Sequence, residues 1–148
     1  MLKSFLILLG LAAVFGHGQP QWGSLPDALS QAATEGRPAL VYVQAAWCGP
    51  CRQLERDTFT DGTVAARLGQ FALAQLTIDE RDRTHRVGPY RLSEAEWAAR
   101  LGAETTPTLV FLAPDGSVLG RHTGFLPAEG LLPILDAVLA AEEEPGTH

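Results

Sequence analysis

The sequence predicts a single α/β domain with a central mixed β-sheet flanked by helices and an extra helix at its amino-terminal end. The chain has 148 residues, of which 46% are hydrophobic and 19% charged, a composition that suits one core of ordinary size. Short β-rich runs alternate with helical patterns, and strands joined through helices are parallel. Near the carboxyl end, Pro114-Asp115-Gly116 separates two β-rich runs and predicts a hairpin, which adds an antiparallel strand.

The first half of the domain begins with an amphipathic helix that ends at Gly36. A run centred on residues 40–43 has the length and composition of a buried strand. The following helix opens at Gly49-Pro50, because proline is tolerated in the first turn of a helix, where its missing N–H is not needed. We expect a polar linker over 19–23, a helix over 24–35, a strand over 39–46, a helix over 49–68 with an interruption near 61–62, and a strand over 71–78.

The second half opens with a polar segment that carries Gly88-Pro89, and this composition predicts a surface loop over 80–92. Ser93 and Glu96 have the spacing of a capping box, which marks the start of a helix. The elements expected after the loop are a helix over 93–101, strands over 108–113 and 117–122, a helix over 127–141, and a disordered tail over 142–148. The order of elements is therefore αβαβαββα.

The first 18 residues have the pattern of a secretory signal peptide. Lys3 gives a positive start, residues 5–15 form an apolar run, and the small residues Gly16 and Gly18 offer a cleavage site. The run falls well short of the ~20 residues that a membrane-spanning helix needs. We therefore expect a folded domain over 19–141 that is secreted or periplasmic. An uncleaved segment that anchors the chain to a membrane is the alternative.

The charge distribution argues against one class of partner. The formal net charge is −6, from 11 basic and 17 acidic residues. The basic residues are scattered and are densest around Arg81 and Arg83, so the chain lacks a patch that would hold a phosphate backbone. We expect a monomer with no nucleic-acid partner and no cofactor.

The two cysteines, Cys48 and Cys51, lie in the segment Trp47-Cys48-Gly49-Pro50-Cys51. A disulfide between residues three positions apart closes almost no loop, so it contributes little stability through chain entropy. Small secreted proteins stabilised by disulfides carry more cysteines, widely spaced. Reactivity therefore explains this pair better than stability does, although a structural or vestigial disulfide remains an alternative.

Two other uses of a Cys-x-x-Cys pair lack the residues they need. A zinc site requires two further ligands, and the four histidines form no spaced pair with the cysteines or with one another. Covalent haem attachment requires a histidine directly after the second cysteine, where Arg52 stands. We therefore expect no metal site.

The segment suits thiol chemistry because of its place at the start of a helix. A cysteine at a helix N-terminus has a lowered pKa, so Cys48 is expected to supply the thiolate that attacks a disulfide. Cys51 lies about one turn further into the helix, where it can attack the Cys48 sulfur while being shielded itself. Pro50 keeps the turn rigid, and Gly49 leaves room for a substrate.

These residues, together with Thr106-Pro107 further along the chain, resemble the thioredoxin superfamily over residues 24–141. The segment from Trp47 to Asp61 is similar to the C-terminal domain of periplasmic thiol:disulfide interchange reductases. Other segments resemble periplasmic thioredoxins that accompany sulfur-oxidation systems. The resemblance implies the thioredoxin fold, and a cis peptide bond before Pro107 that faces the cysteines. The backbone of Thr106, directly before this proline, would then pair with an extended segment of a substrate protein. An ordinary trans proline at the start of an edge strand is the alternative.

The chain departs from the thioredoxin pattern at Tyr42, where these families carry a buried aspartate. A tyrosine with a pKa near 10 does not readily take the proton that Cys51 must lose. Glu55 lies four residues after Cys51, hence on the same helical face. Glu55 is therefore our candidate for the proton acceptor, and a solvated surface glutamate is the alternative. Trp47 is expected to form a packing and contact surface.

The resemblance thus implies an extracytoplasmic reductase of protein or small-molecule disulfides. Its partners would be a disulfide-bearing client protein or small thiol and an upstream electron donor in the membrane or periplasm. Two alternatives stay open: a disulfide-forming oxidase on the same fold, and a non-catalytic binding domain. The Gly49-Pro50 pair argues against the oxidase, because strong oxidants carry other residues there.

Overall fold

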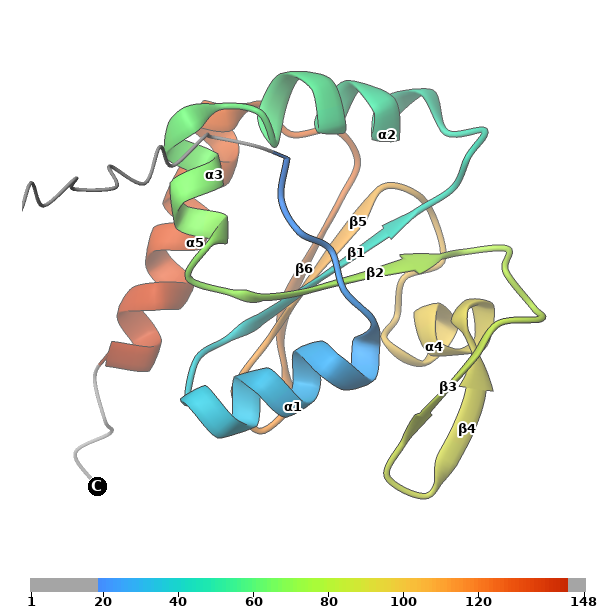
Figure 1. Ribbon diagram of the computed structural model, residues 1–148. Coiled ribbons are helices and arrows are strands. Elements are labelled where there is room, and N and C mark those ends of the chain that lie inside the picture. Colours follow the sequence, from blue (N-terminus) through green and yellow to red (C-terminus); the bar gives the residue numbers. More distant parts are fainter. Residues whose placement is uncertain (1–18, 144–148) are drawn as a thin grey trace, which may run out of the picture.

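The computed structural model describes residues 19–143, which fold around a four-stranded mixed sheet (Figure 1). Its strands are β1 (Ala39–Gln44), β2 (Ala72–Thr77), β5 (Thr108–Leu112) and β6 (Val118–Thr123), in the order β2-β1-β5-β6. β1 pairs with β2 in parallel and with β5 antiparallel, and β6 pairs antiparallel with β5. The predicted fold class and the predicted hairpin are confirmed.

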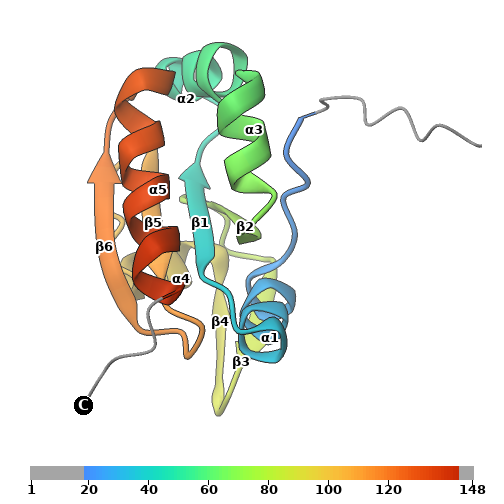
Figure 2. The ribbon, with the colours of Figure 1, turned by 90° about the vertical axis from the view of Figure 1, so that its left-hand side faces the viewer.

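Helices cover both faces of the sheet, and Figure 2 looks onto one of these faces. α1 (Leu25–Glu35) and α4 (Glu94–Arg100) pack on one face. The other face is covered by α2 (Gly49–Gln53), the π-helical turn η1 (Leu54–Thr58), α3 (Gly62–Leu68) and α5 (Ala128–Glu143). Because both faces are covered, residues 39–43 of β1 are all buried. An uninterrupted apolar run is what such a strand requires.

Local sequence signals set the helix boundaries. The Ser24 hydroxyl accepts the N–H of Asp27 and caps α1, and Gly36 ends it with φ 64°, a left-handed conformation that glycine adopts without strain. At α4 the predicted capping box is present: Ser93 and Glu96 each accept the other's backbone N–H.

The predicted helix over 49–68 contains a π-helical turn that the pattern did not reveal. The Phe59 N–H donates to the Leu54 carbonyl at 3.0 Å, a five-residue separation that widens the helix by one residue. The helix then ends, as expected, and α3 follows with Asp61 as its capping residue. The Asp61 carboxylate accepts the N–H groups of Thr63 and Val64.

The prediction of a surface loop over 80–92 was wrong. This segment forms a two-stranded hairpin of β3 (Thr84–Val87) and β4 (Tyr90–Ser93), turned at Gly88-Pro89. Gly88 has φ 56°, which the turn requires. Val87 and Leu92 pack against the core beneath α1 and α4. The high charge of the segment hid the strands, because His85 shares the inner side of β3 with Val87 and no clear alternation of polar and apolar residues results.

The predicted polar linker over 19–23 is also more ordered than expected. We call residues 19–24 the strap. Its Gly23 bridges to Ala74 at the outer edge of β2, with hydrogen bonds from the Gly23 N–H to Leu73 O (2.9 Å) and from the Gln75 N–H to Gly23 O (3.0 Å). A glycine fits here because a Cβ at this position would lie only 3.3 Å from the Leu73 carbonyl oxygen.

The described part of the chain ends within the last helix. α5 runs to Glu143, two residues beyond the predicted end of the helix. The expected signal peptide over 1–18 and residues 144–148 of the expected tail lie outside the described residues. Within residues 19–143, no helix combines the length and the apolar character needed to cross a membrane.

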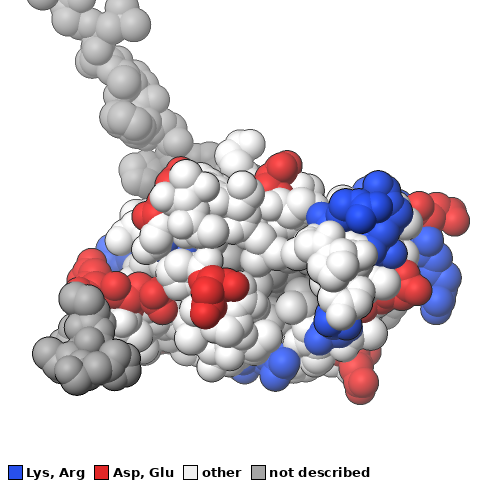
Figure 3. All heavy atoms as spheres, turned by 90° about the horizontal axis from the view of Figure 1, so that it is seen from below, with Lys and Arg blue, Asp and Glu red and all other residues white. Residues whose placement is uncertain are grey.

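A buried carboxylate fastens the β3–β4 hairpin to the sheet. Glu94, only 4% exposed, accepts hydrogen bonds from the Thr77 N–H (2.8 Å) and from Arg83 Nη1 (3.1 Å), and His85 Nε2 lies 3.0 Å from it. Burial raises the pKa of Glu94, but the hydrogen bonds from His85, Thr77 and Arg83 outweigh it. The pKa of Glu94 therefore lies below its ordinary value. Arg86 and Arg91 stand opposite each other on the hairpin. Figure 3 shows Lys and Arg side chains gathered mainly at one end of the molecule, with Asp and Glu side chains among them.

Replacing Glu94 by glutamine should lower the free energy of unfolding at pH 7 by about 1–3 kcal/mol, because the buried donors lose a charged acceptor. The pKa of Glu94 is lowered in the folded state, so its contribution is full above its ordinary value of 4.5 and fades as the pH falls through the folded value. Urea denaturation of Glu94→Gln against pH measures this loss, with the exposed Glu104→Gln as control. A stability difference that stays constant down to pH ~3 would contradict the assignment.

Candidate active site

The cysteine segment lies where the chain leaves β1 and enters α2 (Figure 1). Cys48 is the residue that precedes the helix, with an extended backbone (φ −85°, ψ 105°), and Pro50 occupies the first turn as predicted. The Cys48 N–H donates to Ala45 O (3.2 Å), and the Arg52 N–H donates to Cys48 O (3.3 Å). These bonds hold the cysteine at the helix N-terminus.

Cys48 and Cys51 are joined by a disulfide. The Cys51 N–H, one of the unpaired donors of the first helical turn, points at Cys48 Sγ at 3.2 Å. This donor and the positive end of the helix stabilise a thiolate on Cys48 when the disulfide is reduced. Cys48 is 4% exposed and Cys51 1%, so both are nearly enclosed and the inner cysteine is the better shielded.

Trp47 and Gly49 form the exposed rim beside the cysteines. Trp47 is 66% exposed, and its indole N–H donates to the Asp79 carboxylate at 2.9 Å, which ties the rim to the connection after β2. A Cβ at Gly49 would lie 3.9 Å from Arg52 Nη2, its nearest neighbour, so the space above Gly49 is open. An exposed aromatic ring next to an open glycine gives a partner a surface to contact.

Thr106-Pro107 lies at the same end of the sheet. The peptide bond before Pro107 is cis, as the resemblance implied. Thr108 pairs with Val43, so Pro107 sits level with the point where β1 ends and the cysteine segment begins. The turn is held by the Gly124 N–H, which donates to Pro107 O (2.9 Å), and by Thr108 Oγ1, which donates to Thr105 O (2.7 Å).

Tyr42 and Glu55 are hydrogen-bonded to each other. The Tyr42 hydroxyl donates to Glu55 Oε1 at 2.9 Å and lies 3.5 Å from the Cys51 carbonyl oxygen. Burial, the hydrogen bond to Glu55 and the negative charge of Glu55 all raise the pKa of Tyr42 far above its ordinary value. Tyr42 is therefore a fixed donor. The sequence marks each residue as unusual but does not show that they meet, because β1 and η1 are brought together only by the fold.

The site offers no evident metal ligands. Over residues 19–143, no group of three or more His, Cys, Asp or Glu side chains is arranged to hold a metal ion. The described histidines lie away from the cysteines: His85 is bound to Glu94, and His122 belongs to β6.

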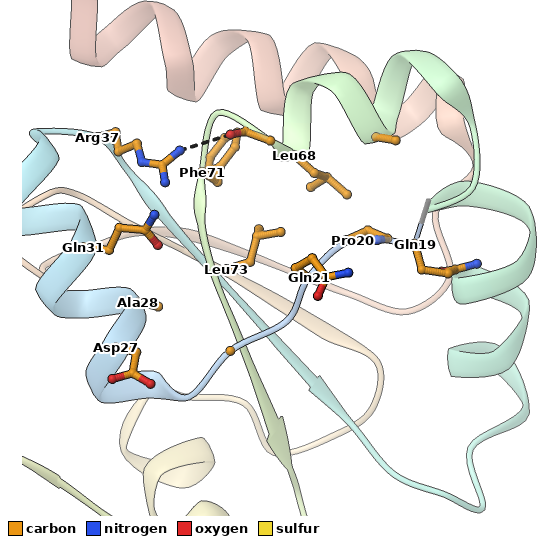
Figure 4. Close-up of a pocket in the computed structure, with 13 residues that line it drawn as sticks. Gln19, Pro20, Gln21, Asp27, Ala28, Gln31, Arg37, Leu68, Phe71 and Leu73 are labelled. Atoms are coloured by element: carbon orange, nitrogen blue, oxygen red, sulfur yellow. Dashed lines mark hydrogen bonds between the residues drawn. The ribbon is translucent and has the colours of Figure 1, made fainter. Parts of the chain in front are cut away.

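A separate pocket of about 390 Å³ lies between the strap, α1 and α3, as Figure 4 shows. Its wall carries Gln21 from the strap, Gln31 from α1 and Arg37, whose Nη1 donates to Gly69 O at 3.0 Å. None of the predicted site residues lines it.

Comparison with known proteins agrees with this geometry. A family model described as a thioredoxin-like domain matches residues 25–139. The chain is 32% identical over 111 residues to the thiol:disulfide interchange protein DsbD 1 of Pseudomonas aeruginosa and 30% identical over 110 residues to DsbD of Yersinia enterocolitica. These matches cover 72% and 73% of this chain but only 17% of each relative.

Among solved structures, the chain is similar to a thioredoxin from Thermus thermophilus, with a TM-score of 0.70 and 26% identity. The match covers 88% of this chain and 100% of the thioredoxin. Three findings lead to one assignment. The family match extends over most of the chain, a Cys-x-x-Cys disulfide lies at a helix start, and a cis-proline lies at the same end of the sheet. The chain belongs to the thioredoxin-like family of thiol-disulfide oxidoreductases.

Proposed function

We propose that this protein is an extracytoplasmic reductase that passes two electrons from the Cys48–Cys51 dithiol to a disulfide in a client protein or a small thiol adduct. The observation that carries the proposal is the disulfide at the start of α2, with the Cys51 N–H directed at Cys48 Sγ. A sulfur in this position is a good attacking thiolate, because the helix N-terminus stabilises its charge.

The reaction proceeds by two exchanges. The Cys48 thiolate attacks one sulfur of the client disulfide, so a Cys48–client bond forms, the client S–S bond breaks, and the other client sulfur leaves as a thiolate that takes a proton from solvent. Cys51 then loses its proton and attacks Cys48 Sγ. The Cys48–Cys51 bond forms, the mixed disulfide breaks, and the second client sulfur leaves. An upstream donor returns two electrons and restores the dithiol.

The residues around the cysteines have binding roles in this scheme. Trp47 contacts the client through its exposed ring, and Gly49 leaves room for the client disulfide to reach Cys48. Thr106, ahead of the cis-proline Pro107, pairs through its backbone with an extended client segment. Pro50 restricts the backbone of the first turn of α2, which keeps the two sulfur atoms in a fixed position relative to each other.

The DsbD relatives are named for thiol:disulfide interchange, and this chain corresponds to about a sixth of their length. We infer a periplasmic or secreted location, with an electron donor at or near the membrane. The similarity supports this location, and so does the pattern of the first 18 residues, with Lys3 followed by a short apolar run and small residues.

Cys48→Ser should reduce disulfide-exchange activity at least ~100-fold, since it removes the attacking thiolate. Cys51→Ser should retain the attack and accumulate a mixed disulfide, because the resolving thiol is missing. Non-reducing electrophoresis after incubation with a disulfide-bearing protein such as insulin measures both. If Cys48→Ser were the variant that accumulated adducts, the roles of the two cysteines would be reversed.

The reduction potential of the Cys48–Cys51 pair should lie nearer the about −270 mV of thioredoxin than the about −120 mV of a strong oxidant on this fold. Equilibration of the protein with glutathione or dithiothreitol buffers, followed by quantification of free thiols, gives the value. A potential near the oxidising end would favour the disulfide-forming oxidase. A normal potential without turnover of insulin in the presence of a reductant would favour a binding domain.

Expression of the gene with its native first residues should yield an exported protein that begins near His17 or Gln19, where small residues close the apolar run. Amino-terminal sequencing of the exported fraction identifies the first residue. A membrane-bound product that retains Met1 would contradict this prediction and indicate that the first residues are an uncleaved anchor.

A further inference from the structure

The strap lies outside residues 25–139, the segment that the family model matches, yet it reaches the support of the active site. The ring of Trp22 lies 5.2 Å, centroid to centroid, from the rings of both Tyr42 and Phe59. Tyr42 and Phe59 are themselves 5.2 Å apart in an edge-to-face arrangement. Three rings from the strap, β1 and the end of η1 thus pack as one cluster, and the two hydrogen bonds at Gly23 fix the strap to β2.

This cluster holds the ring whose hydroxyl binds Glu55. Tyr42 is 1% exposed, so its ring cannot turn away without opening the core. Over the described residues, the Tyr42 hydroxyl is the side-chain group that hydrogen-bonds to Glu55. The two arginines nearest in sequence are engaged elsewhere: Arg52 Nη1 donates to Ala46 O, and Arg56 pairs with Asp57. The position of the Glu55 carboxylate therefore depends on Tyr42.

Glu55 also has an exit to solvent. A groove of about 530 Å³ runs beside the start of the strap, and Glu55 lines it together with Trp22, Arg52, Arg56 and Gln75. The Glu55 carboxylate thus binds the buried hydroxyl of Tyr42, which lies 3.5 Å from the Cys51 carbonyl oxygen, and the same residue lines a groove at the protein surface. A proton received from the interior can leave through this groove.

We propose that Tyr42 is a positioning residue for the resolving step, that Trp22 holds it in place, and that together they fix Glu55 as the acceptor of the Cys51 proton. This inference rests on the proposed dithiol exchange. As Cys51 attacks Cys48 Sγ, its S–H proton passes to the Glu55 carboxylate, the Cys48–Cys51 bond forms and the client sulfur leaves with the electron pair of the broken bond. Glu55 then returns the proton to water in the groove. A tyrosine-held glutamate on η1 thereby takes the place of a buried aspartate on β1.

The two exchanges can be followed separately with one probe. The reduced protein is mixed with the chromogenic disulfide dithiobis(2-nitrobenzoate). A first coloured thiolate is released when Cys48 attacks and a second when Cys51 resolves the adduct. The rate of each phase is measured against pH for wild type, Tyr42→Phe, Trp22→Ala and Glu55→Gln. Tyr90→Phe and Gln21→Ala, an exposed tyrosine on the hairpin and an exposed strap residue, are the matched controls.

Tyr42→Phe, Trp22→Ala and Glu55→Gln should each slow the second phase, with Glu55→Gln about tenfold or more near pH 6–7 and the two positioning variants by less. The loss should vanish at high pH, where hydroxide removes the proton from a thiol of ordinary pKa near 8.5. The first phase should change less than about twofold, because Cys48 depends on the helix N-terminus and not on Glu55. The two controls should match wild type in both phases.

A double-mutant cycle separates positioning from general loosening. If Tyr42 acts through Glu55, Tyr42→Phe slows the second phase in the wild type but not in the Glu55→Gln background. Superimposable second-phase profiles for Tyr42→Phe and wild type would overturn the inference, and so would equal slowing of both phases. A wild-type protein with no second phase would instead refute the proposed function itself.

Discussion

The burial of β1 on both faces is the constraint on which the arrangement of the site depends. β1 is enclosed by α1 and α4 on one side and by α2, α3 and α5 on the other. The side chains of its residues 39–43 are therefore buried. Reactive groups must therefore appear where the strand ends, and the cysteines follow directly after it. The same end of the sheet receives Pro107 at the start of β5, so pairing between β1 and β5 brings the two segments together.

Enclosure also determines how polar groups inside the molecule are satisfied. A buried hydroxyl or carboxylate without a partner costs free energy, so each must find one. Tyr42 resolves this by donating to Glu55 on the neighbouring helix. Glu94 resolves it by accepting a backbone donor from β2 and side-chain donors from the hairpin. In both cases the polar contact also joins different elements of the fold: β1 with η1, and α4 with β2 and β3.

Much of this organisation follows from local patterns that the sequence displays. The sheet strands, the capping box at Ser93, the helix break near Asp61 and the place of the cysteines at a helix start all rest on neighbouring residues, and all were predictable. The β3–β4 hairpin was not, because His85, Arg86 and Arg91 give it the composition of a loop, and only Val87 and Leu92 are apolar residues packed against the core.

The strap and the Tyr42–Glu55 hydrogen bond escaped prediction for a different reason. Both are contacts that form only when the chain folds. A single sequence does not show which of its residues will meet. The π-helical turn also escaped prediction. It shifts the pattern of buried side chains along the helix by only one residue, and hydrophobic periodicity over so short a helix does not reveal such a shift.

The strap has one more consequence, for the solubility of the folded protein. An open sheet has two edge strands whose unpaired backbone groups can recruit another chain. At β2 the strap occupies part of that edge through Gly23, so a foreign strand would first have to displace it. At β6, the opposite edge, the strand carries the charged Arg121 and shifts register against β5 near Leu112. These features disfavour regular pairing with a neighbour. The two edges of the sheet are thus protected against aggregation by unrelated means, one by a bound segment and the other by its own irregularity.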